Sequence, residues 1–558
     1  MTDSSKPIGK SLISPPTGTF LAVAVAMNLP FLLCYPEWPV LKTPLVRSLI
    51  INFVLFVAPG LPIVNLMIHK GWLRQFYVLW VIFLSFLTFV SIIVARYLFD
   101  LPVSAGGIWL WTWVITNLGF LLNLLAGGPP TFGISVNCKR TLSFLLLFVA
   151  AYVIFFYGAT RVVPVLGDQD DEVQGTAYGL LTRLKPSLLT GRNTEYMFAH
   201  PPLLHVYVAG SILYYNLLDE VAVYDSQSPN RLSLSEIDER YRQHPYVLET
   251  RTPNVFLAAL TVVLLGWWVT RMTGRRWFGA LVASAYATTP EVFVRSVYGG
   301  YFTIGNFALV QILLAVEAWM SDHGRFTRMT CVLAGIFAAL ADHKMMLLPV
   351  SVVIWEALGS WRKMRFRAAA KALMHPVAIG FAVGTLMFWA YGLAISPKDF
   401  WMDHIRHHLV DRVLNYNARG LDMSHYPSVP ALWLEFWRDM GYLLLPLGIV
   451  SLGFLCFAKA STINAENANS EAGWRGMPGL WAIWASLISF AFSIIDWRQT
   501  KHLAPLSLAL FLAPACMATR RVPRIIIGGL LVALLIWNIG VLSVVAGNFD
   551  FLKKVPEW

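Results

Sequence analysis

The sequence predicts an all-α membrane protein, a helical bundle that crosses the bilayer about 15 times. Hydrophobic residues make up 57% of the 558-residue chain, charged residues only 13%, and the mean hydropathy is +0.60. Apolar runs long enough to cross the ~30 Å hydrocarbon core as a helix recur from one end to the other. A helix also satisfies its backbone hydrogen bonds internally, as lipid requires.

The predicted spans form two groups, separated by a long polar segment at 161–253. The first group lies at about 17–35, 48–68, 76–98, 107–127 and 141–160. The second lies at about 254–272, 277–294, 299–320, 328–342, 345–360, 374–395, 439–458, 478–495, 503–518 and 524–546. A second polar segment, 396–438, interrupts this group and is rich in His, Arg and aromatic residues.

The basic residues predict which side of the membrane each loop occupies. With the N-terminus inside, loops with two or more Lys or Arg, such as 361–367, fall on the cytoplasmic side. The segments 161–253 and 396–438 then lie outside. This pattern requires that the apolar stretch within 201–217 does not cross the membrane. We expect it to form a helix at the outer interface or partly sunk into the leaflet, the alternative being an ordinary span.

Composition excludes several classes of function. The net charge of +12 comes from Lys and Arg dispersed in short loops, which is typical of membrane proteins and does not indicate a nucleic-acid partner. The 5 Cys are widely spaced and form no CxxC pair, so neither a zinc site nor a disulfide framework is predicted. The N-terminus lacks a signal-peptide cleavage pattern, and we expect the first apolar run to remain as a span.

An acidic cluster follows the fifth span, in the stretch GDQDDEVQGTAYGLL. It contains Asp168, Asp170, Asp171 and Glu172, and the apolar spacing after it predicts a helix with one face on the membrane. Carboxylates in the first turn of a helix are favoured by its dipole, so the cluster has a purely structural interpretation. The other interpretation is that it performs chemistry at the outer face.

Later motifs favour chemistry. His200 precedes a Pro-Pro pair that starts the next helix, and Arg251 lies at the mouth of the following span. GIFAALADHKMMLLP places Lys344 at an outer span end, beside His343, and DWRQTKHLAPLSLAL does the same for Arg498 and His502. In this order, the acidic pair, HPPL, the Arg and the Lys resemble the GT-C superfamily of membrane glycosyltransferases. The similarity is greatest to the branch of protein O-mannosyltransferases and the lipid A aminoarabinose transferase.

The resemblance implies a division of the chain and a reaction. Residues 141–558 would form the catalytic core, and 1–140 an additional N-terminal region of four spans. The enzyme would transfer a sugar, with inversion, from a polyprenyl-phosphate donor to an acceptor hydroxyl at the outer face of the plasma or inner membrane. The acceptor would be a lipid, a polysaccharide or a protein.

The resemblance also implies roles for individual residues. Asp171 would accept the proton of the attacking hydroxyl, with Asp170 as the next candidate and Glu172 orienting the acceptor. The growing charge on the leaving phosphate would be stabilised by cations and imidazoles at outer span ends. These candidates are Lys344, Arg251, His200, His343, Arg498 and His502.

Two alternatives remain open at the level of sequence. Asp168-Gln169-Asp170 has the DxD pattern that holds Mg²⁺ or Mn²⁺ in other enzymes, although we expect no metal and no other cofactor. A transporter or a flippase of lipid-linked glycans would also have many spans. Such proteins typically carry acidic residues inside the spans near the midplane, whereas the acidic cluster here lies in a loop.

Overall fold

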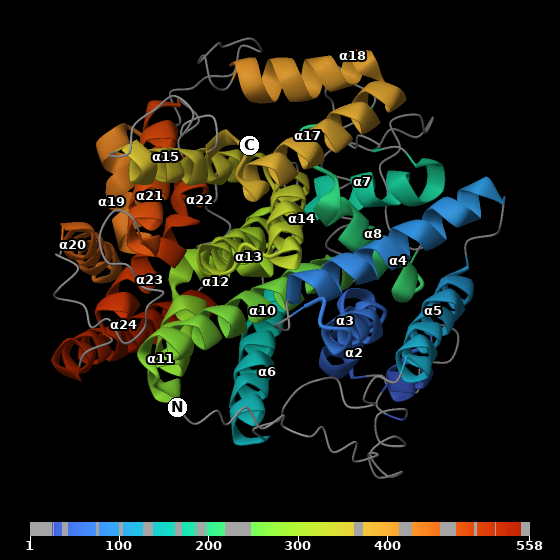
Figure 1. The fold of residues 1–558 in the computed structure, drawn as a ribbon, viewed down its shortest axis with the longest axis horizontal. Coiled ribbons are helices and arrows are strands. Elements are labelled where there is room, and N and C mark those ends of the chain that lie inside the picture. Colours follow the sequence, from blue (N-terminus) through green and yellow to red (C-terminus); the bar gives the residue numbers. More distant parts are fainter. Residues whose placement is uncertain are drawn as a thin grey trace, which may run out of the picture. The chain divides into compact units, whose positions relative to one another are not determined.

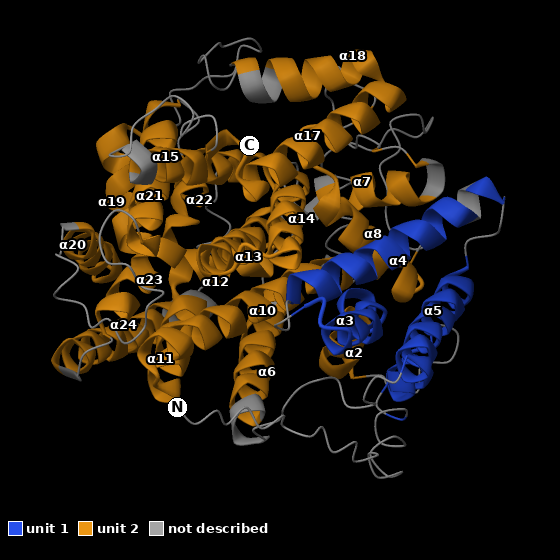
Figure 2. Ribbon diagram, in the orientation of Figure 1, with its two compact units in different colours: residues 1–42, 53–135 blue, residues 43–52, 136–558 orange. Residues whose placement is uncertain are grey.

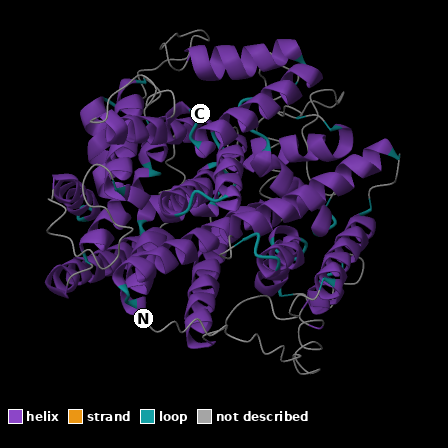
Figure 3. Cartoon of the chain, in the orientation of Figure 1, coloured by secondary structure: helices purple, strands orange, loops and turns teal. Residues whose placement is uncertain are grey.

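The computed structural model describes residues 25, 27–35, 43–73, 78–99, 104–126, 138–161, 170–184, 186, 196, 198–217, 247–361, 372–411, 427–457, 476–495, 499–518 and 521–547. For some residues at helix ends, among them 170–172, it describes the backbone alone. Every regular element within these ranges is a helix (Figure 3). The all-α fold predicted from hydropathy is therefore confirmed.

The chain divides into two compact units (Figure 2). The first comprises residues 1–42 and 53–135, and the second comprises residues 43–52 and 136–558. The sequence predicts a boundary at residue 140, and the division in the structure falls after residue 135. The structure also assigns residues 43–52, which include the start of α2 (Pro44–Phe56), to the second unit.

The first unit contains α3 (Gly60–His69), α4 (Val78–Leu98) and α5 (Ala105–Leu125), and α3 packs closely on α4 at a glycine. A Cβ atom at Gly60 would lie 2.1 Å from the carbonyl oxygen of Val81, so only glycine allows this approach of α3 to α4. The Gly60 N–H donates to Ser85 Oγ at 3.0 Å. This hydrogen bond satisfies a polar group inside an apolar unit.

The second unit contains the remaining helices (Figure 1). Its first half comprises α6 (Cys138–Arg161), α7 (Asp170–Arg183), α8 (Leu203–Tyr214), α10 (Val247–Thr273), α11 (Arg276–Thr288), α12 (Pro290–Val297) and α13 (Phe302–Ser321). The middle comprises α14 (Arg325–Ala341), η1 (His343–Met346), α15 (Leu347–Trp361), α17 (Pro376–Ile395), α18 (Pro397–Phe400) and η2 (Trp401–Asp411). The last part comprises α19 (Val429–Asp439), α20 (Leu444–Phe457), α21 (Met477–Ile494), α22 (Thr500–Leu503), α23 (Leu506–Met517) and α24 (Arg521–Gly547).

Long apolar helices identify the chain as an integral membrane protein. Within the described ranges, 8 helices are long and apolar enough to cross a bilayer, or up to 10 if each of two bent helix pairs forms one span. Several expected spans correspond to shorter helices, such as α11 with 13 residues and α23 with 12 residues. Residues 17–24 and 26 of the first expected span lie outside the described residues, and the count of about fifteen stays a prediction.

The outer surfaces of these helices fit a lipid environment. On α17, Leu386, Met387 and Leu393 are exposed, and on α24 the exposed residues include Ile525 and Ile536. Apolar faces of this extent are unfavourable in water and are the normal lipid-facing surface of a membrane helix.

Helices α14 and α17 lie side by side with almost no space between their backbones (Figure 1). A Cβ atom at Gly380 would lie 1.9 Å from the carbonyl oxygen of Val332, and one at Gly335 would lie 2.3 Å from that of Val377. Gly380 and Gly384 form a GxxxG pattern, which allows close helix packing in membranes. This packing fixes the end of α14, where Lys344 follows, beside the second half of α17.

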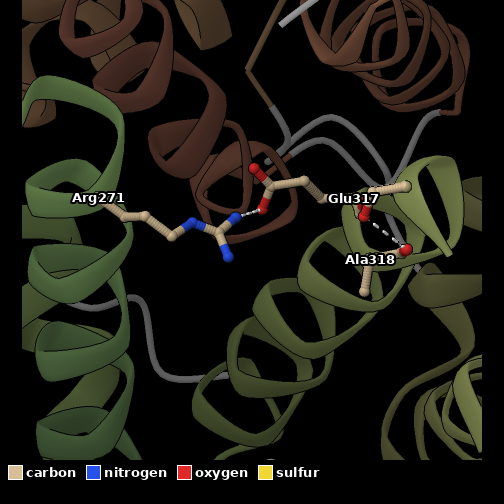
Figure 4. Close-up of polar contacts among 4 residues, drawn as sticks. Arg271, Glu317 and Ala318 are labelled. Carbon is tan, nitrogen blue, oxygen red and sulfur yellow. Dashed lines mark hydrogen bonds and ion pairs between the residues drawn. The ribbon is translucent and has the colours of Figure 1, made fainter. Parts of the chain in front are cut away.

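The C-terminal ends of α10 and α13 are joined by an ion pair. Arg271, in the last turn of α10, points toward Glu317 of α13 and bonds to it (Figure 4). Its guanidinium also lies 4.9 Å from the ring of Trp267. Because the pair is partly exposed, we expect it to fix helix orientation more than to supply stability.

Candidate functional site

The predicted acidic turn lies at the start of α7, which begins at Asp170. The side chains of Asp170, Asp171 and Glu172 lie outside the described residues, as does the whole of Asp168. One turn after Asp171, Gln174 Nε2 donates to Thr250 Oγ1 at 3.1 Å. Residues three apart share a helix face, so the acidic turn lies beside the start of α10, where Arg251 follows Thr250.

The other end of α7 faces a different helix. The carbonyl oxygen of Leu184 accepts from the Tyr391 hydroxyl of α17 at 3.3 Å. A helix of 14 residues is about 20 Å long, so α7 extends from the α10 side of the site to the α17 side.

The apolar spacing of α7 predicted that this face of the helix lies on the membrane. In the structure the face packs on other helices instead. Val173, Ala177 and Leu181 are buried, and α7 packs against α8 and α10. Periodicity identified the buried face correctly, but hydropathy alone does not distinguish a lipid partner from a protein partner.

The HPPL motif starts α8 where the two prolines predict a helix start, with Pro202 preceding Leu203. The helix has 12 residues, or about 18 Å, which is too short to cross the hydrocarbon core. Eleven of its residues are buried in protein. The neighbours of α8 are therefore mainly protein, and its position at the outer interface stays a prediction.

His200 and its neighbours form the centre of the candidate site. The ring of His200 stacks on that of Tyr301, with 3.8 Å between centroids and 20° between planes. The Tyr301 hydroxyl is bonded to His205 Nε2 at 2.7 Å. Tyr301 lies at the N-terminus of α13, so HPPL and the start of α13 meet here.

Two further imidazoles extend this cluster. His343, in η1, lies 6.0 Å from the His200 ring and 4.7 Å from the ring of His404 in η2. His343 Nε2 is 2.7 Å from the carbonyl oxygen of Ala199. A carbonyl only accepts hydrogen bonds, so Nε2 carries the proton in this contact.

Aromatic side chains enclose this histidine cluster on one side. The rings of Phe388 and Phe400 lie 5.0 Å and 4.9 Å from the His404 ring. Burial, and after it the neighbouring His343, lower the pKa of His404 to about 3. His404 is therefore neutral near neutral pH and offers hydrogen bonding, not charge.

A buried carboxylate joins the second polar segment to the HPPL loop. Asp403 Oδ2 accepts from the Phe198 N–H at 2.8 Å. The ring of Phe198 also packs edge-on against Phe400, with 5.5 Å between centroids. Phe400 and Asp403, near the beginning of segment 396–438, thus form one wall of the site.

Lys344 provides a cation beside the histidine cluster. It directly follows His343, and its Nζ lies 3.6 Å from Asp342 Oδ2. The Lys344 side chain is 20% exposed, whereas Asp342 is buried. Asp342 Oδ1 also accepts from the Lys344 N–H at 3.1 Å, so one carboxylate fixes both backbone and ammonium. The ammonium is held in place and still reaches the surface.

Arg251 and His502 have other surroundings. The Arg251 guanidinium is buried, donates to the Ala159 carbonyl at 2.9 Å and lies 5.6 Å from the Tyr298 ring. His502, in α22, stacks on Phe492 of α21 at 5.0 Å. Arg498 lies outside the described residues. The structure thus places His200 and His343 near each other, with Lys344 next to His343 in the chain, and gives Arg251 contacts that link α10 to the last turns of α6.

Sequence reasoning missed Tyr301, Asp403 and His404. The stretch DHIRHHLVDR (403–412) contains Asp403 and His404, but the sequence indicates for it only an outer loop that meets donor phosphate or acceptor, or else a metal site, without a role for a single residue. Tyr301 lies in GGYF, where nothing in a single sequence distinguishes it from the many other interface aromatics. Its position at the start of α13 becomes informative only when α8 is packed against it.

Among the described residues, no group of three or more His, Cys, Asp or Glu side chains is arranged to hold a metal ion. This statement does not cover the DxD pair, because the side chains of Asp168 and Asp170 lie outside the described residues.

No family model matches the chain. It is similar to the crystal structure of ArnT from Cupriavidus metallidurans bound to undecaprenyl phosphate, at 16% identity and a TM-score of 0.44. That match covers 68% of this chain and 61% of the ArnT chain. The apo state of the same protein matches at 16% identity and a TM-score of 0.43, over 69% of this chain and 61% of ArnT.

Proposed function

We propose that the chain is an inverting glycosyltransferase that uses a polyprenyl-phosphate-linked sugar and acts at the outer face of the plasma or inner membrane. The observation that carries this proposal is the proximity of His200 and His343, whose rings lie 6.0 Å apart, with Phe388 6.0 Å from the His343 ring and with Lys344, held by Asp342, next to His343 in the chain. A cation and hydrogen-bonding imidazoles next to apolar rings suit a phosphate attached to a long hydrocarbon chain.

The leaving phosphate requires charge stabilisation. When the glycosidic bond breaks, the electron pair goes to the phosphate oxygen, and a fixed cation stabilises that transition state. Lys344 supplies the cation in this proposal, because Asp342 holds it in place while its side chain stays partly exposed. His200 and His343 supply hydrogen bonds. His404 remains neutral and shapes the wall.

The acceptor requires a base. Asp171 takes the proton of the attacking hydroxyl as the new bond forms at the anomeric carbon, with Asp170 as the alternative base and Glu172 orienting the acceptor. Support comes from the position of α7, whose first turn is held beside α10 by the bond from Gln174 to Thr250. Arg251, the next residue, contributes by fixing this corner of the core.

The polyprenyl tail requires a route from the bilayer. The second half of α17 carries exposed Leu386 and Leu393 on the same helix as Phe388, which packs on the histidine cluster. A tail lying along this face reaches the site sideways from the membrane. No nucleotide site is needed for such a donor.

The rival function, transport or flipping of a lipid-linked glycan, fits the distribution of acids less well. In the described helices that qualify as single spans, the carboxylates are Glu249 at the start of α10 and Glu317 near the end of α13. Glu317 is paired with Arg271. Transporters usually place acids near the midplane.

The test separates lipid binding from chemistry. The full-length protein in nanodiscs is titrated with undecaprenyl phosphate, and glycan profiles are compared in cells that express each variant. Lys344→Met is expected to weaken lipid binding by about tenfold or more, the loss of one charge-assisted contact. Asp171→Asn is expected to bind the lipid normally and to abolish the glycan product. Lys398→Met, at an exposed lysine in α18, is the matched control and is expected to change neither.

Two outcomes would contradict the proposal. An unchanged glycan profile with Asp171→Asn removes Asp171 from the role of base. Movement of a labelled polyprenyl phosphate across proteoliposomes at full rate by that variant, with no transferase product from the wild type, favours the flippase. We also expect EDTA to leave the transferase reaction unchanged, in line with the expected absence of a metal.

A further inference from the structure

We propose that Tyr301 is a positioning residue for His200, one that fixes the imidazole of the HPPL loop against the donor phosphate; this rests on the proposed function. The contacts of Tyr301 with two histidines support it. Tyr301 stacks on His200 at 3.8 Å, and the Tyr301 hydroxyl is bonded to His205 at 2.7 Å. His205 in turn packs edge-on against the Tyr301 ring, with 5.6 Å between centroids.

The stacking partner is itself rigid. Tyr301 is 6% exposed and lies at the first turn of α13, where Gly305 N–H bonds to its carbonyl oxygen at 3.0 Å. His205 is 1% exposed and is fixed in the first turns of α8. The ring of Tyr301 therefore has a defined plane, and the plane of His200 follows it at 20°.

The backbone of the HPPL loop is held separately. His343 donates from Nε2 to the carbonyl oxygen of Ala199, the residue before His200. The His343 and His200 rings are nearly parallel, at 21°. His343 thus fixes the position of the backbone just before His200, and Tyr301 fixes the orientation of the His200 ring. These are different constraints, so loss of Tyr301 frees the ring while the loop stays in place.

A merely structural tyrosine would behave differently from a positioning one. If Tyr301 only fills space, its removal weakens lipid binding by the same factor whether or not His200 is present. If it acts through His200, the effect disappears once His200 is removed. A double-mutant cycle measures this difference.

The experiment titrates undecaprenyl phosphate into the full-length protein in nanodiscs for Tyr301→Leu, Tyr301→Phe, His200→Ala and the double variant Tyr301→Leu/His200→Ala. Tyr301→Leu is expected to weaken binding about tenfold, and Tyr301→Phe, which keeps the stack, by less than about threefold. In the His200→Ala background, Tyr301→Leu is expected to have no further effect. Tyr152→Leu, at another buried tyrosine, is the control and should act by the same factor in both backgrounds.

A second measurement does not depend on the lipid. In protein labelled at its 12 histidines, the imidazole signal of His200 is assigned by its loss in His200→Ala. Tyr301→Leu is expected to shift and broaden that signal, and Tyr301→Phe to leave it sharp. Equal fold-changes in both backgrounds, or an unshifted His200 signal in Tyr301→Leu, would overturn the inference. A wild type that does not bind undecaprenyl phosphate but shows the expected His200 shifts would instead refute the proposed function and the phosphate part of this inference.

Discussion

Gly380 of α17 touches the backbone of Val332 in α14, and a single added methyl group would lie 1.9 Å from that carbonyl oxygen. This contact sets the position of the whole site. His343 and Lys344 follow α14, and Phe388 lies two turns beyond Gly380 on α17. The approach of the two helices therefore determines how the cation and the histidine cluster meet the aromatic wall.

Substitution of Gly380 by Ala is expected to lower stability by about 3 kcal/mol, because the methyl group must displace the backbone of a neighbouring helix. Thermal unfolding of the purified protein in detergent measures the change. Gly529→Ala on α24 is the matched control. A Cβ atom there meets nothing within 4 Å, and Ala favours the helix by up to about 1 kcal/mol. A Gly380→Ala protein as stable as Gly529→Ala would show that α14 and α17 do not pack as described.

Arg251→Met is expected to destabilise the protein even without a lipid, by about 2–4 kcal/mol. The reason is that the guanidinium is buried and bonds to the last turns of α6 through Ala159. Arg276→Met, at an exposed position at the start of α11, removes the same charge and should have little effect. If Arg251→Met instead kept full stability and lost only affinity for undecaprenyl phosphate, Arg251 would be a phosphate ligand, as the sequence had predicted.

Stability is expected to fall as the pH falls below about 6.5. Burial lowers the pKa of His205 to about 3, and burial together with His343 lowers that of His404 to about 3. In the unfolded chain a histidine titrates near 6.5. The unfolded state therefore binds protons first, and the stability present above about pH 6.5 is lost toward pH 3, by up to about 1.4 kcal/mol per pH unit for each histidine.

The slope of melting temperature against pH checks this prediction. His404→Phe keeps an aromatic ring among Phe388 and Phe400. It is expected to remove about half of the pH dependence of stability that His205 and His404 together produce. A slope unaffected by that substitution would mean that His404 is protonated in the folded protein at mildly acidic pH.

The ion pair between Arg271 and Glu317 is expected to contribute little. Their side chains are 37% and 18% exposed, so solvent screens the attraction and a double-mutant cycle should give at most about 1 kcal/mol. A coupling of several kcal/mol would show that this end of α10 and α13 is shielded from water. The measurement compares Arg271→Met, Glu317→Gln and the double variant by thermal unfolding.

The sequence was sufficient for the helical architecture because hydropathy and span length are local properties. The expected span at 374–395 is α17 almost to the residue, and the expected helix start after Pro201 and Pro202 is α8. Even the GxxxG pattern of Gly380 and Gly384 is visible in the sequence, although its partner Gly335 is known only from the packed helices. For α7 and α8, periodicity shows which face is apolar but does not show whether that face packs on protein or on lipid.

The site was predictable only where a motif marked it. His200, His343 and Lys344 were expected together because the resemblance placed each at the same side of the membrane; in the structure the rings of His200 and His343 lie 6.0 Å apart, and a shared role with Lys344 stays a prediction. Arg251 was expected to meet the phosphate, but burial against Ala159 and Tyr298 depends on tertiary contacts that no single sequence displays. The same holds for Tyr301, whose role arises from His200 and His205 packing on it.

A structure of the full-length protein with undecaprenyl phosphate bound, determined by cryo-electron microscopy in nanodiscs, tests the central claim most directly. We predict that the phosphate lies within about 3 Å of Lys344 Nζ and within hydrogen-bonding distance of His200 or His343, in a cavity that Asp171 also lines. A phosphate bound away from these residues, or Asp171 facing a different cavity, would contradict the proposed glycosyltransferase.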